Sequence, residues 1–196
     1  MKKFLKMFFP HDGIYEVLVG TSGIKPIIKP LGIIVNGNEL NFRIYKNTLT
    51  FANLEKNNRC SIHITLDTSY FILSILEKIN FDIDNEYNLP ILKNLNIIYA
   101  ECTRISNGDP SVFSVNPFDL EVNSITVPTA YNRGAFISVD LLVNYTRLDI
   151  YKGSELQRLI NILSYEFSVV KRTSPYTANL LEEVENKVKS KGFKLD

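Results

Sequence analysis

The sequence predicts an α+β protein, with a β-barrel-like part over residues 1–127 and a mainly helical part over residues 128–196. Two patterns in the chain predict this division. Before residue 66, apolar and polar residues alternate in several segments, which is the period of a half-buried strand. After residue 128, apolar residues recur every three or four positions, which is the period of an amphipathic helix. With 196 residues, the chain is long enough for one domain or for a domain with an appendage.

The first three strands are predicted over residues 14–19, 26–35 and 39–45. In the third strand, Leu40, Phe42 and Ile44 alternate with polar residues, so we expect one face of it to be buried. An Asn-Gly pair at 36–37 separates the second and third strands. This pair favours a tight hairpin turn in which both central residues have positive φ.

The residues after the third strand predict a short helix and then a fourth strand. Thr48 or Thr50 is suited to be the N-cap of a helix that runs to Lys56, because a threonine hydroxyl accepts a hydrogen bond from the first turn. The fourth strand follows over residues 59–66. Its alternation places Cys60, Ile62 and Ile64 on one face and Ser61, His63 and Thr65 on the other.

The middle of the chain predicts a further helix and then a loop. Asp67 or Thr68 is expected to cap a helix that runs to Lys78, because the apolar residues between them follow helical spacing. Residues 80–89 are acidic and rich in asparagine, which is typical of a loop.

Three more strands are predicted before the helical part. The fifth strand covers residues 95–105, and the segment 106–110 is expected to be a turn. Residues 112–115 and 120–127 are predicted as two separate or edge strands. An Asn-Pro pair at 116–117 lies between them, and proline is confined to edge strands and bulges.

Three helices are predicted in the C-terminal part. Asn132 is a candidate N-cap for the first, which ends at Arg147, although its β-branched residues leave a strand as the alternative. Ser154 and Gln157 form a capping-box pattern at the start of the second helix. Pro175 opens the third helix, at the first position that proline favours.

The composition indicates a globular protein without a nucleic-acid or membrane partner. Hydrophobic residues make up 45% of the chain, and the net charge of +1 provides no basic field. The N-terminal apolar run is interrupted by Lys6 and is too short for a secretory signal. No segment reaches the roughly 18 consecutive apolar residues of a membrane span. We therefore expect a cytoplasmic protein.

The cysteines and histidines do not suggest a metal site. Cys60 and Cys102 lie in predicted strands without Cys-x-x-Cys spacing, so two thiols in the core are expected. His11 and His63 are the only histidines, and no cluster of metal ligands is predicted.

The segment 43–54 carries the strongest functional signal in the chain. The exposed N–H groups of a helix's first turn and the helix dipole attract anions, so a strand-to-helix corner with nearby cations suits a phosphate monoester. The polar residues around this corner are Arg43, Lys46, Thr48 and Thr50. The structural alternative is a polar corner with a capping threonine. Asn53 either contacts a ligand or orients the turn through local hydrogen bonds.

The same segment resembles the phosphate-binding turn of FMN-binding split-barrel proteins related to flavin reductases. It is most similar to the archaeal domain-of-unknown-function family 447, whose pattern is Arg-Pro-Phe-Lys-Gly-Ser-x-Thr-Tyr-x-Asn-Leu. This chain matches the pattern at Arg43, Lys46, Thr48, Thr50, Asn53 and Leu54. Further segments that match in the family's order are 14–21, 29–33, 61–67, 131–134 and 140–148.

The resemblance implies an FMN-binding split β-barrel with a C-terminal helical segment, and a homodimer with flavin near the subunit interface. It places Thr21, Pro30, Leu31 and Gly32 near the isoalloxazine, and residues 43–53 at the phosphate. It also implies flavin-dependent reduction of a small substrate through the flavin N5. The electron donor would be a nicotinamide, bound transiently, or a reduced deazaflavin.

Three departures from the family pattern leave other functions open. Asn47 replaces the glycine of the turn, although asparagine tolerates a left-handed backbone better than most residues. The segment 27–29 is bulkier than in the family, and His63 replaces an asparagine. The alternatives are a flavin carrier without its own substrate, and a non-catalytic relative kept for a structural or partner-binding role.

Two further sets of residues have a functional and a structural interpretation. His63 is a candidate proton donor, because its ordinary pKa suits proton transfer near neutrality, or else a hydrogen-bonded strand residue. In the C-terminal part, Asp140 is expected to pair with an arginine. Arg133 and Arg147 are the candidates, and either one is also suited to hold an anionic substrate.

Overall fold

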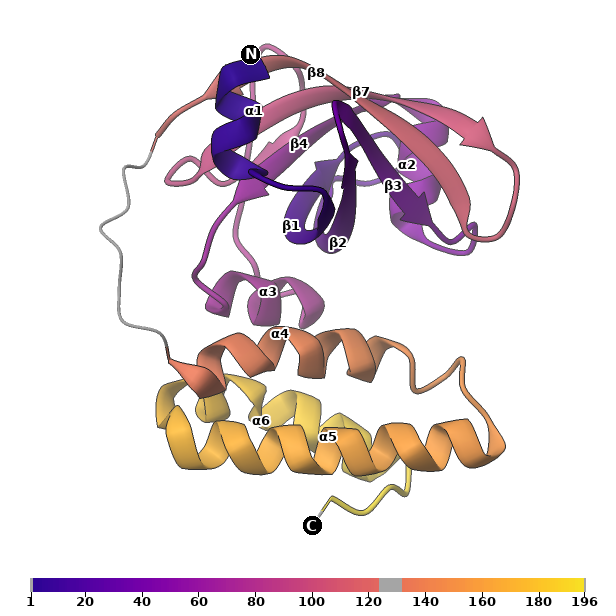
Figure 1. The fold of residues 1–196 in the computed structure, drawn as a ribbon, viewed down its shortest axis with the longest axis vertical. Helices are drawn as coiled ribbons and strands as arrows, with labels where there is room; N and C mark the ends of the chain where they lie inside the picture. Colours follow the sequence, from indigo (N-terminus) through magenta and orange to yellow (C-terminus); the bar gives the residue numbers. More distant parts are fainter. Residues whose placement is uncertain (1, 124–131, 196) are drawn as a thin grey trace. The chain divides into compact units, whose positions relative to one another are not determined.

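The computed structural model describes residues 2–123 and 132–195, which form two compact units. One unit contains Met1–Leu66 and Asn80–Thr126, and the other contains Asp67–Ile79 and Val127–Asp196 (Figure 1). The segment 67–79 groups with the C-terminal helices rather than with the strands on either side of it. The helical unit therefore extends beyond the residues 128–196 of the predicted division.

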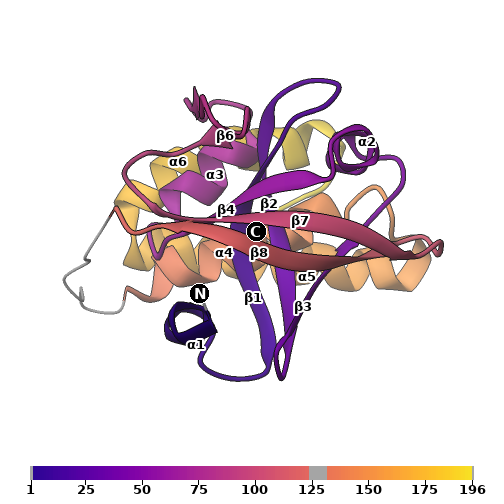
Figure 2. The same cartoon turned by 90° about the horizontal axis from the view of Figure 1, so that it is seen from above.

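Six antiparallel strands form a closed barrel in the first unit, so the predicted α+β barrel is confirmed. The strands are β1 (Gly13–Thr21), β2 (Ile27–Asn36), β3 (Glu39–Ile44), β4 (Arg59–Ile64), β7 (Asn96–Ser106) and β8 (Ser111–Glu121). Around the barrel they follow the order β1-β2-β3-β8-β7-β4. Two short helices, α1 (Lys2–Phe8) and α2 (Leu49–Lys56), lie on opposite sides of it (Figure 1, Figure 2). The patterns above did not predict α1.

The inward-facing residues of the six strands fill the barrel. They alternate with outward-facing residues along each strand, as the sequence predicted. The core includes Val17, Val19, Ile33, Phe42, Ile62, Ile98, Phe113 and Val115. Cys60 and Cys102 lie in the same core as free thiols, with their Sγ atoms 3.3 Å apart. The prediction of two core thiols is confirmed.

The hairpin between β2 and β3 differs in detail from the predicted turn. Asn36 pairs with Glu39, so the central residues are Gly37 and Asn38 rather than the Asn-Gly pair. Only Gly37 has a positive φ, at 59°. A positive φ at the first central residue alone is the pattern of a type II′ turn, which favours glycine there.

A single strand, β8, replaces the two separate strands predicted on either side of Pro117. The register explains how a proline fits within it. Pro117 lies opposite Ala100 and Asp119 lies opposite Tyr99, so Phe118 is an extra residue at a bulge. The missing N–H of proline is tolerated where the ladder is already irregular. β8 ends at Glu121, and residues 124–127 of the predicted last strand lie outside the described part of the chain.

The segment predicted as a loop at 80–89 contributes to a small two-stranded ribbon. Its strands are β5 (Asp82–Ile83) and β6 (Pro90–Ile91). The turn between them is held by Asp84, whose Oδ1 accepts the N–H groups of Glu86 at 3.0 Å and Tyr87 at 2.6 Å. This local bonding is the Asx pattern that makes aspartate common in turns.

The helical unit contains α3 (Ser69–Ile75), α4 (Arg133–Thr146), α5 (Gly153–Thr173) and α6 (Pro175–Ser190). The helical prediction for α4 is confirmed, and Asn132 caps it by accepting the N–H of Ala135 at 2.9 Å. α3 begins as predicted but ends before Lys78, where Glu77 has a φ of 59°. None of the helices in the described ranges, 2–123 and 132–195, is long and apolar enough to cross a membrane.

The predicted capping box at the start of α5 does not form. The helix begins at Gly153 with Lys152 as its N-cap, which places Ser154 inside the first turn. A serine at that position is past the cap, so its hydroxyl does not take the N-cap role. The buried face of α5 nevertheless follows the predicted spacing, with Leu159, Leu163 and Phe167 buried.

Candidate functional site

The predicted cofactor-binding residues gather at the end of the barrel where α2 lies. Thr21 ends β1, Pro30 lies near the start of β2, and Arg43 lies near the end of β3. Lys46 lies two residues after the end of β3, in the segment that leads into α2. The opposite end of the same strands contains the β2–β3 turn at Gly37. The candidate residues therefore belong to one end of one compact unit.

The start of α2 is built as the sequence predicted, with Thr48 as the N-cap. The Thr48 Oγ1 accepts the N–H of Phe51 at 3.2 Å and donates to the carbonyl of Tyr45 at 2.8 Å. Its hydroxyl is thus already used by the chain. Thr50 lies inside the helix and is 8% exposed.

The first turn of α2 offers unused hydrogen-bond donors. No hydrogen bond joins the backbone N–H groups of Leu49 or Thr50 to another described residue. Helix geometry leaves the first N–H groups without internal partners, and a ligand anion or water can satisfy them. Asn47, just before the cap, does not have a positive φ, so the turn does not need the glycine of the family pattern.

Lys46 is held by the hairpin between β7 and β8. Its Nζ donates to the carbonyl of Asn107 at 2.7 Å, and its backbone N–H donates to the Asp109 Oδ1 at 3.1 Å. An ammonium group carries three protons, so two remain for other acceptors. The hairpin fixes the position of the cation at the start of α2.

Pro30, Gly32 and Arg43 share the outer face of the barrel wall. Gly32 pairs with Glu16, whereas its neighbour Ile33 pairs with Phe42 and points into the core. Continuing that register by one residue places Gly32 beside Arg43 on the outside. Two positions back, Pro30 has the same orientation.

Two features of this outer face favour a ligand. Arg43 is exposed and forms no ion pair with the described residues. At Gly32, an added Cβ would lie 3.1 Å from Cγ2 of Ile14 and 3.4 Å from Oε1 of Glu16. The missing side chain therefore leaves backbone accessible where any other residue would crowd its neighbours.

Asn53 has a structural position at the same end of the barrel. Its Oδ1 accepts the N–H groups of Ile24 at 2.8 Å and Lys25 at 3.2 Å. Its Nδ2 donates to the Thr21 Oγ1 at 3.0 Å and to the carbonyl of Lys25 at 2.8 Å. Asn53 and Thr21 are both fully buried. Of the two interpretations of Asn53, this geometry supports the one in which its side chain orients the neighbouring loop through hydrogen bonds.

His63 is fully buried, and both ring nitrogens contact the backbone. Its Nδ1 lies 3.1 Å from the carbonyl of Leu18, and its Nε2 accepts the N–H of Leu92 at 3.1 Å. These contacts assign the proton to Nδ1. Burial lowers the pKa of His63 to about 4, so the ring is neutral near pH 7. The geometry supports the structural interpretation of this histidine.

The C-terminal candidates do not form the predicted ion pair. No salt bridge within the described ranges joins Asp140 to an arginine. Arg133 instead donates to the hydroxyl of Tyr165 at 2.9 Å. Asp140 is exposed, and an exposed ion pair contributes little to stability. The charges in the sequence were therefore a weak basis for predicting this pair. Tyr131, which begins the matching segment, lies outside the described residues.

Sequence reasoning missed a buried carboxyl group in α5. Glu166 is 5% exposed, and its two oxygens lie 3.0 and 3.2 Å from the Nδ2 of Asn144, which donates to them. Burial raises the pKa of Glu166 to about 7, and the charge of Asp140 acts in the same direction. Its spacing from Leu163 and Val170 would have identified it as a residue of the buried face.

Among the residues that the structure describes, no group of three or more His, Cys, Asp or Glu side chains is arranged to hold a metal ion.

Two family models match the chain and together cover most of it. The "Protein of unknown function (DUF447) N-terminal domain" matches residues 15–124, and the "Protein of unknown function (DUF447)" C-terminal model matches residues 132–184. No curated protein matches the chain.

Solved structures with the same fold include an FMN-bound DUF447 protein from Methanosarcina mazei. It has a TM-score of 0.75 and 22% identity, and the match covers 93% of this chain and 98% of that one. An NADH:FAD oxidoreductase from Streptomyces globisporus has a TM-score of 0.45 and 10% identity, with 61% and 81% covered. An FMN-binding protein from Thermus thermophilus has a TM-score of 0.44 and 13% identity, with 59% and 74% covered. The first of these shows that the fold extends through the helical part.

Proposed function

This chain belongs to the DUF447 family, and on that premise we propose that it is an FMN-binding flavoprotein. The proposed site is the end of the barrel formed by the outer face of β2 and β3 and by the start of α2. The family's Methanosarcina mazei member is FMN-bound, which supports this choice of ligand.

The observation that carries the proposal is the set of unused donors at the start of α2. The N–H groups of Leu49 and Thr50 are unpaired among the described residues. Arg43, which forms no ion pair with the described residues, lies near the end of β3, and Lys46 lies in the connection from β3 to α2. A phosphate monoester carries nearly two negative charges and three strong acceptor oxygens near pH 7. The helix dipole adds to the attraction. The residues present therefore fit the phosphate of FMN.

The flavin ring is assigned to the outer face of β2 at Pro30 and Gly32. The absent side chain at Gly32 permits close approach to the backbone. Thr21 contributes indirectly, because its hydroxyl is bonded to Asn53 and helps to fix the neighbouring loop. Asn53 has the same positioning role, and His63 is assigned no proton-transfer role.

We further propose that the protein is an oxidoreductase that reduces a small substrate, and that it acts as a cytoplasmic homodimer. Bound FMN supplies the hydride-transfer chemistry, and the chain supplies binding and orientation. A nicotinamide or a reduced deazaflavin serves as the electron donor in this proposal.

A flavin titration tests the proposal directly. Apo-protein is titrated with FMN and with riboflavin, which lacks the phosphate, and quenching of flavin fluorescence is followed. We expect FMN to bind at least roughly tenfold more tightly, because one charge-assisted hydrogen bond is worth about 1.5–3 kcal/mol. Arg43→Ala and Lys46→Ala should weaken FMN binding and leave riboflavin binding unchanged.

Lys56→Ala is the matched control, because this exposed lysine lies at the far end of the same helix. Equal affinity for FMN and riboflavin would mean that the segment 43–54 is only a structural corner. Binding without turnover, in the presence of NADH or a reduced deazaflavin, would identify a flavin carrier rather than a reductase.

A further inference from the structure

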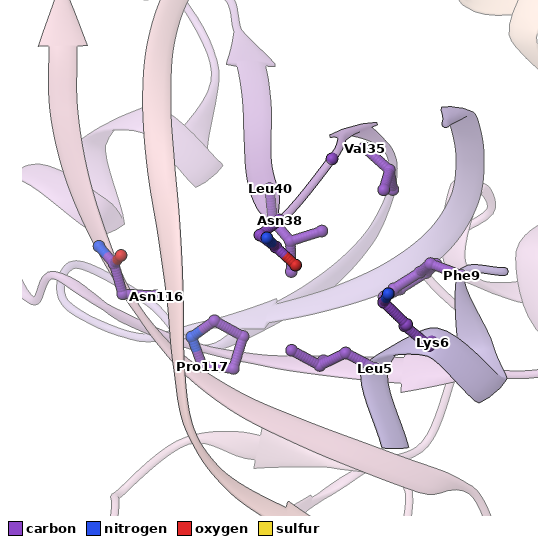
Figure 3. Close-up of a pocket in the computed structure, with 9 residues that line it drawn as sticks. Leu5, Lys6, Phe9, Val35, Asn38, Leu40, Asn116 and Pro117 are labelled. Atoms are coloured by element: carbon purple, nitrogen blue, oxygen red, sulfur yellow. The ribbon is translucent and has the colours of Figure 1, made fainter. Parts of the chain in front are cut away.

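A pocket separate from the proposed flavin site lies at the opposite end of the barrel. It has a volume of about 300 Å³ and lies between α1, the β2–β3 hairpin and β8 (Figure 3). None of the predicted cofactor-binding residues lines it. Leu40 lines it, and Ile44 at the other end of β3 is roughly 13 Å away along the strand. The pocket therefore does not belong to the site described above.

The deep part of the pocket is apolar. Phe9, Val35 and Leu40 are only 5–6% exposed and belong to the barrel's core cluster. In Figure 3, Leu5 reaches from α1 toward Pro117 of β8, below Leu40 and Asn38. Aliphatic and aromatic walls of this kind favour a hydrocarbon ligand, and the volume lies at the lower end of the range for small-molecule sites.

The rim of the pocket is polar, and its lining residues include one cation. Lys6, Asn38 and Asn116 line it, and all three are exposed. Within the described chain, none of these side chains forms a hydrogen bond or an ion pair. The backbone N–H of Gly37 at the same rim is already bonded to the Asp12 Oδ1 at 2.8 Å. One ammonium and two amides are thus left for a ligand.

We propose that this pocket binds a small monocarboxylate with an aliphatic or aromatic body. The carboxylate is bonded at the rim by Lys6 and by the amides of Asn38 and Asn116. The hydrocarbon part lies against Leu5, Phe9 and Leu40. A carboxylate accepts several hydrogen bonds at once, so it suits a rim that offers an ammonium group and amide donors. A neutral or cationic ligand of the same shape lacks this match.

Octanoate is the probe that tests the proposal, with octan-1-ol as its uncharged counterpart. The full chain, labelled with ¹⁵N, is titrated with each probe, and the backbone amide signals are followed by NMR. We expect saturable shifts centred on Gly37 and Asn38. Octanoate should bind roughly fivefold more tightly than octan-1-ol, the effect of one solvent-exposed ion pair.

Two variants and a control separate the contributions of the rim and the apolar part. Lys6→Gln should weaken octanoate binding roughly fivefold and leave octan-1-ol binding unchanged. Leu5→Trp, which fills the apolar part, should abolish binding of both probes. Lys56→Gln, at the other end of the barrel, should change neither. Circular dichroism checks that each variant is folded.

The proposal is overturned if octanoate shows no saturable binding in the millimolar range, or if octan-1-ol binds as tightly as octanoate. It is also overturned if Lys6→Gln and Lys56→Gln weaken octanoate binding equally, because the attraction would then be a property of the whole surface. These outcomes do not depend on whether FMN binds at the other end of the barrel.

Discussion

Asn53 lies only a few residues from Leu49 and Thr50, yet its side-chain amide and their backbone N–H groups are in opposite states. The side-chain amide of Asn53 is fully buried and bonded on both its oxygen and its nitrogen. At the start of the same helix, the N–H groups of Leu49 and Thr50 have no partner among the described residues. The comparison teaches that polar groups saturated by the chain itself hold the fold, whereas unsaturated donors at a helix start are available to water or to a ligand.

The largest effect that tests this comparison is expected from Asn53→Ala. The change removes the acceptor of the Ile24 and Lys25 N–H groups and the donor to Thr21 and Lys25. Loss of several buried partners should lower the free energy of unfolding by about 3 kcal/mol, as measured by urea denaturation.

Asn58→Ala is the matched control for this loss of stability. Asn58 is exposed and its side chain forms no hydrogen bond within the described structure, so its removal should cost little. If Asn53→Ala were as stable as this control but lost FMN affinity, Asn53 would belong with the ligand-binding donors instead.

A second effect, of similar or smaller size, concerns His63 and pH. Its pKa is about 4 in the folded protein and near 6.5 in the unfolded chain, so the unfolded state takes up the proton first. Stability from this group is present above pH 6.5 and is lost as the pH falls toward 4, by at most about 3 kcal/mol.

His63→Asn should remove this part of the pH dependence, whereas a change at the exposed His11 should retain it. The measurement is urea denaturation of the three proteins between pH 4 and pH 7. Parallel stability curves for the wild type and His63→Asn would show that the imidazole is not held neutral by burial.

The smallest effect is expected at Glu166, the buried carboxyl group of α5. Burial holds its pKa at about 7, whereas the unfolded value is near 4.5. The protonated form therefore contributes stability below pH 4.5, and that contribution is lost as the pH rises through 7. Glu166→Gln keeps the shape without the charge and should stabilise the protein by about 1 kcal/mol at pH 8.

This gain should disappear toward pH 4.5, and thermal unfolding at the two pH values measures the difference. Glu155→Gln, in the first turn of the same helix, is an exposed control. A stabilisation that is independent of pH would mean that the charge of Glu166 is not the cause.

The alternation of apolar residues predicted most of the barrel, because side-chain period alone decides which face of a strand is buried. Leu40, Phe42 and Ile44 were placed correctly for this reason. The bulge that admits Pro117 was not predictable, since it depends on the register with β7. Ser154 fits the local capping-box pattern, but the helix begins one residue before it, at Gly153. The pattern alone does not determine that starting point.

The candidate site was only partly predictable from the sequence. Thr48 was identified as a cap because its hydroxyl bonds to a backbone N–H only three residues along the chain. The partners of Lys46 come from the β7–β8 hairpin, more than sixty residues away, and no local pattern indicates them. Likewise, the burial of His63 depends on β6, since Leu92 just after that strand donates to its ring.

The two thiols inside the barrel provide a chemical probe of barrel opening. Cys60 and Cys102 are 0% and 2% exposed, and a hydrogen bond with Cys102 together with burial raises the pKa of Cys60 well above its ordinary value. Only the exposed thiolate reacts with alkylating reagents, so labelling requires the strands around these residues to separate. The rate of alkylation in native buffer therefore measures barrel opening, and binding of either proposed ligand should slow it.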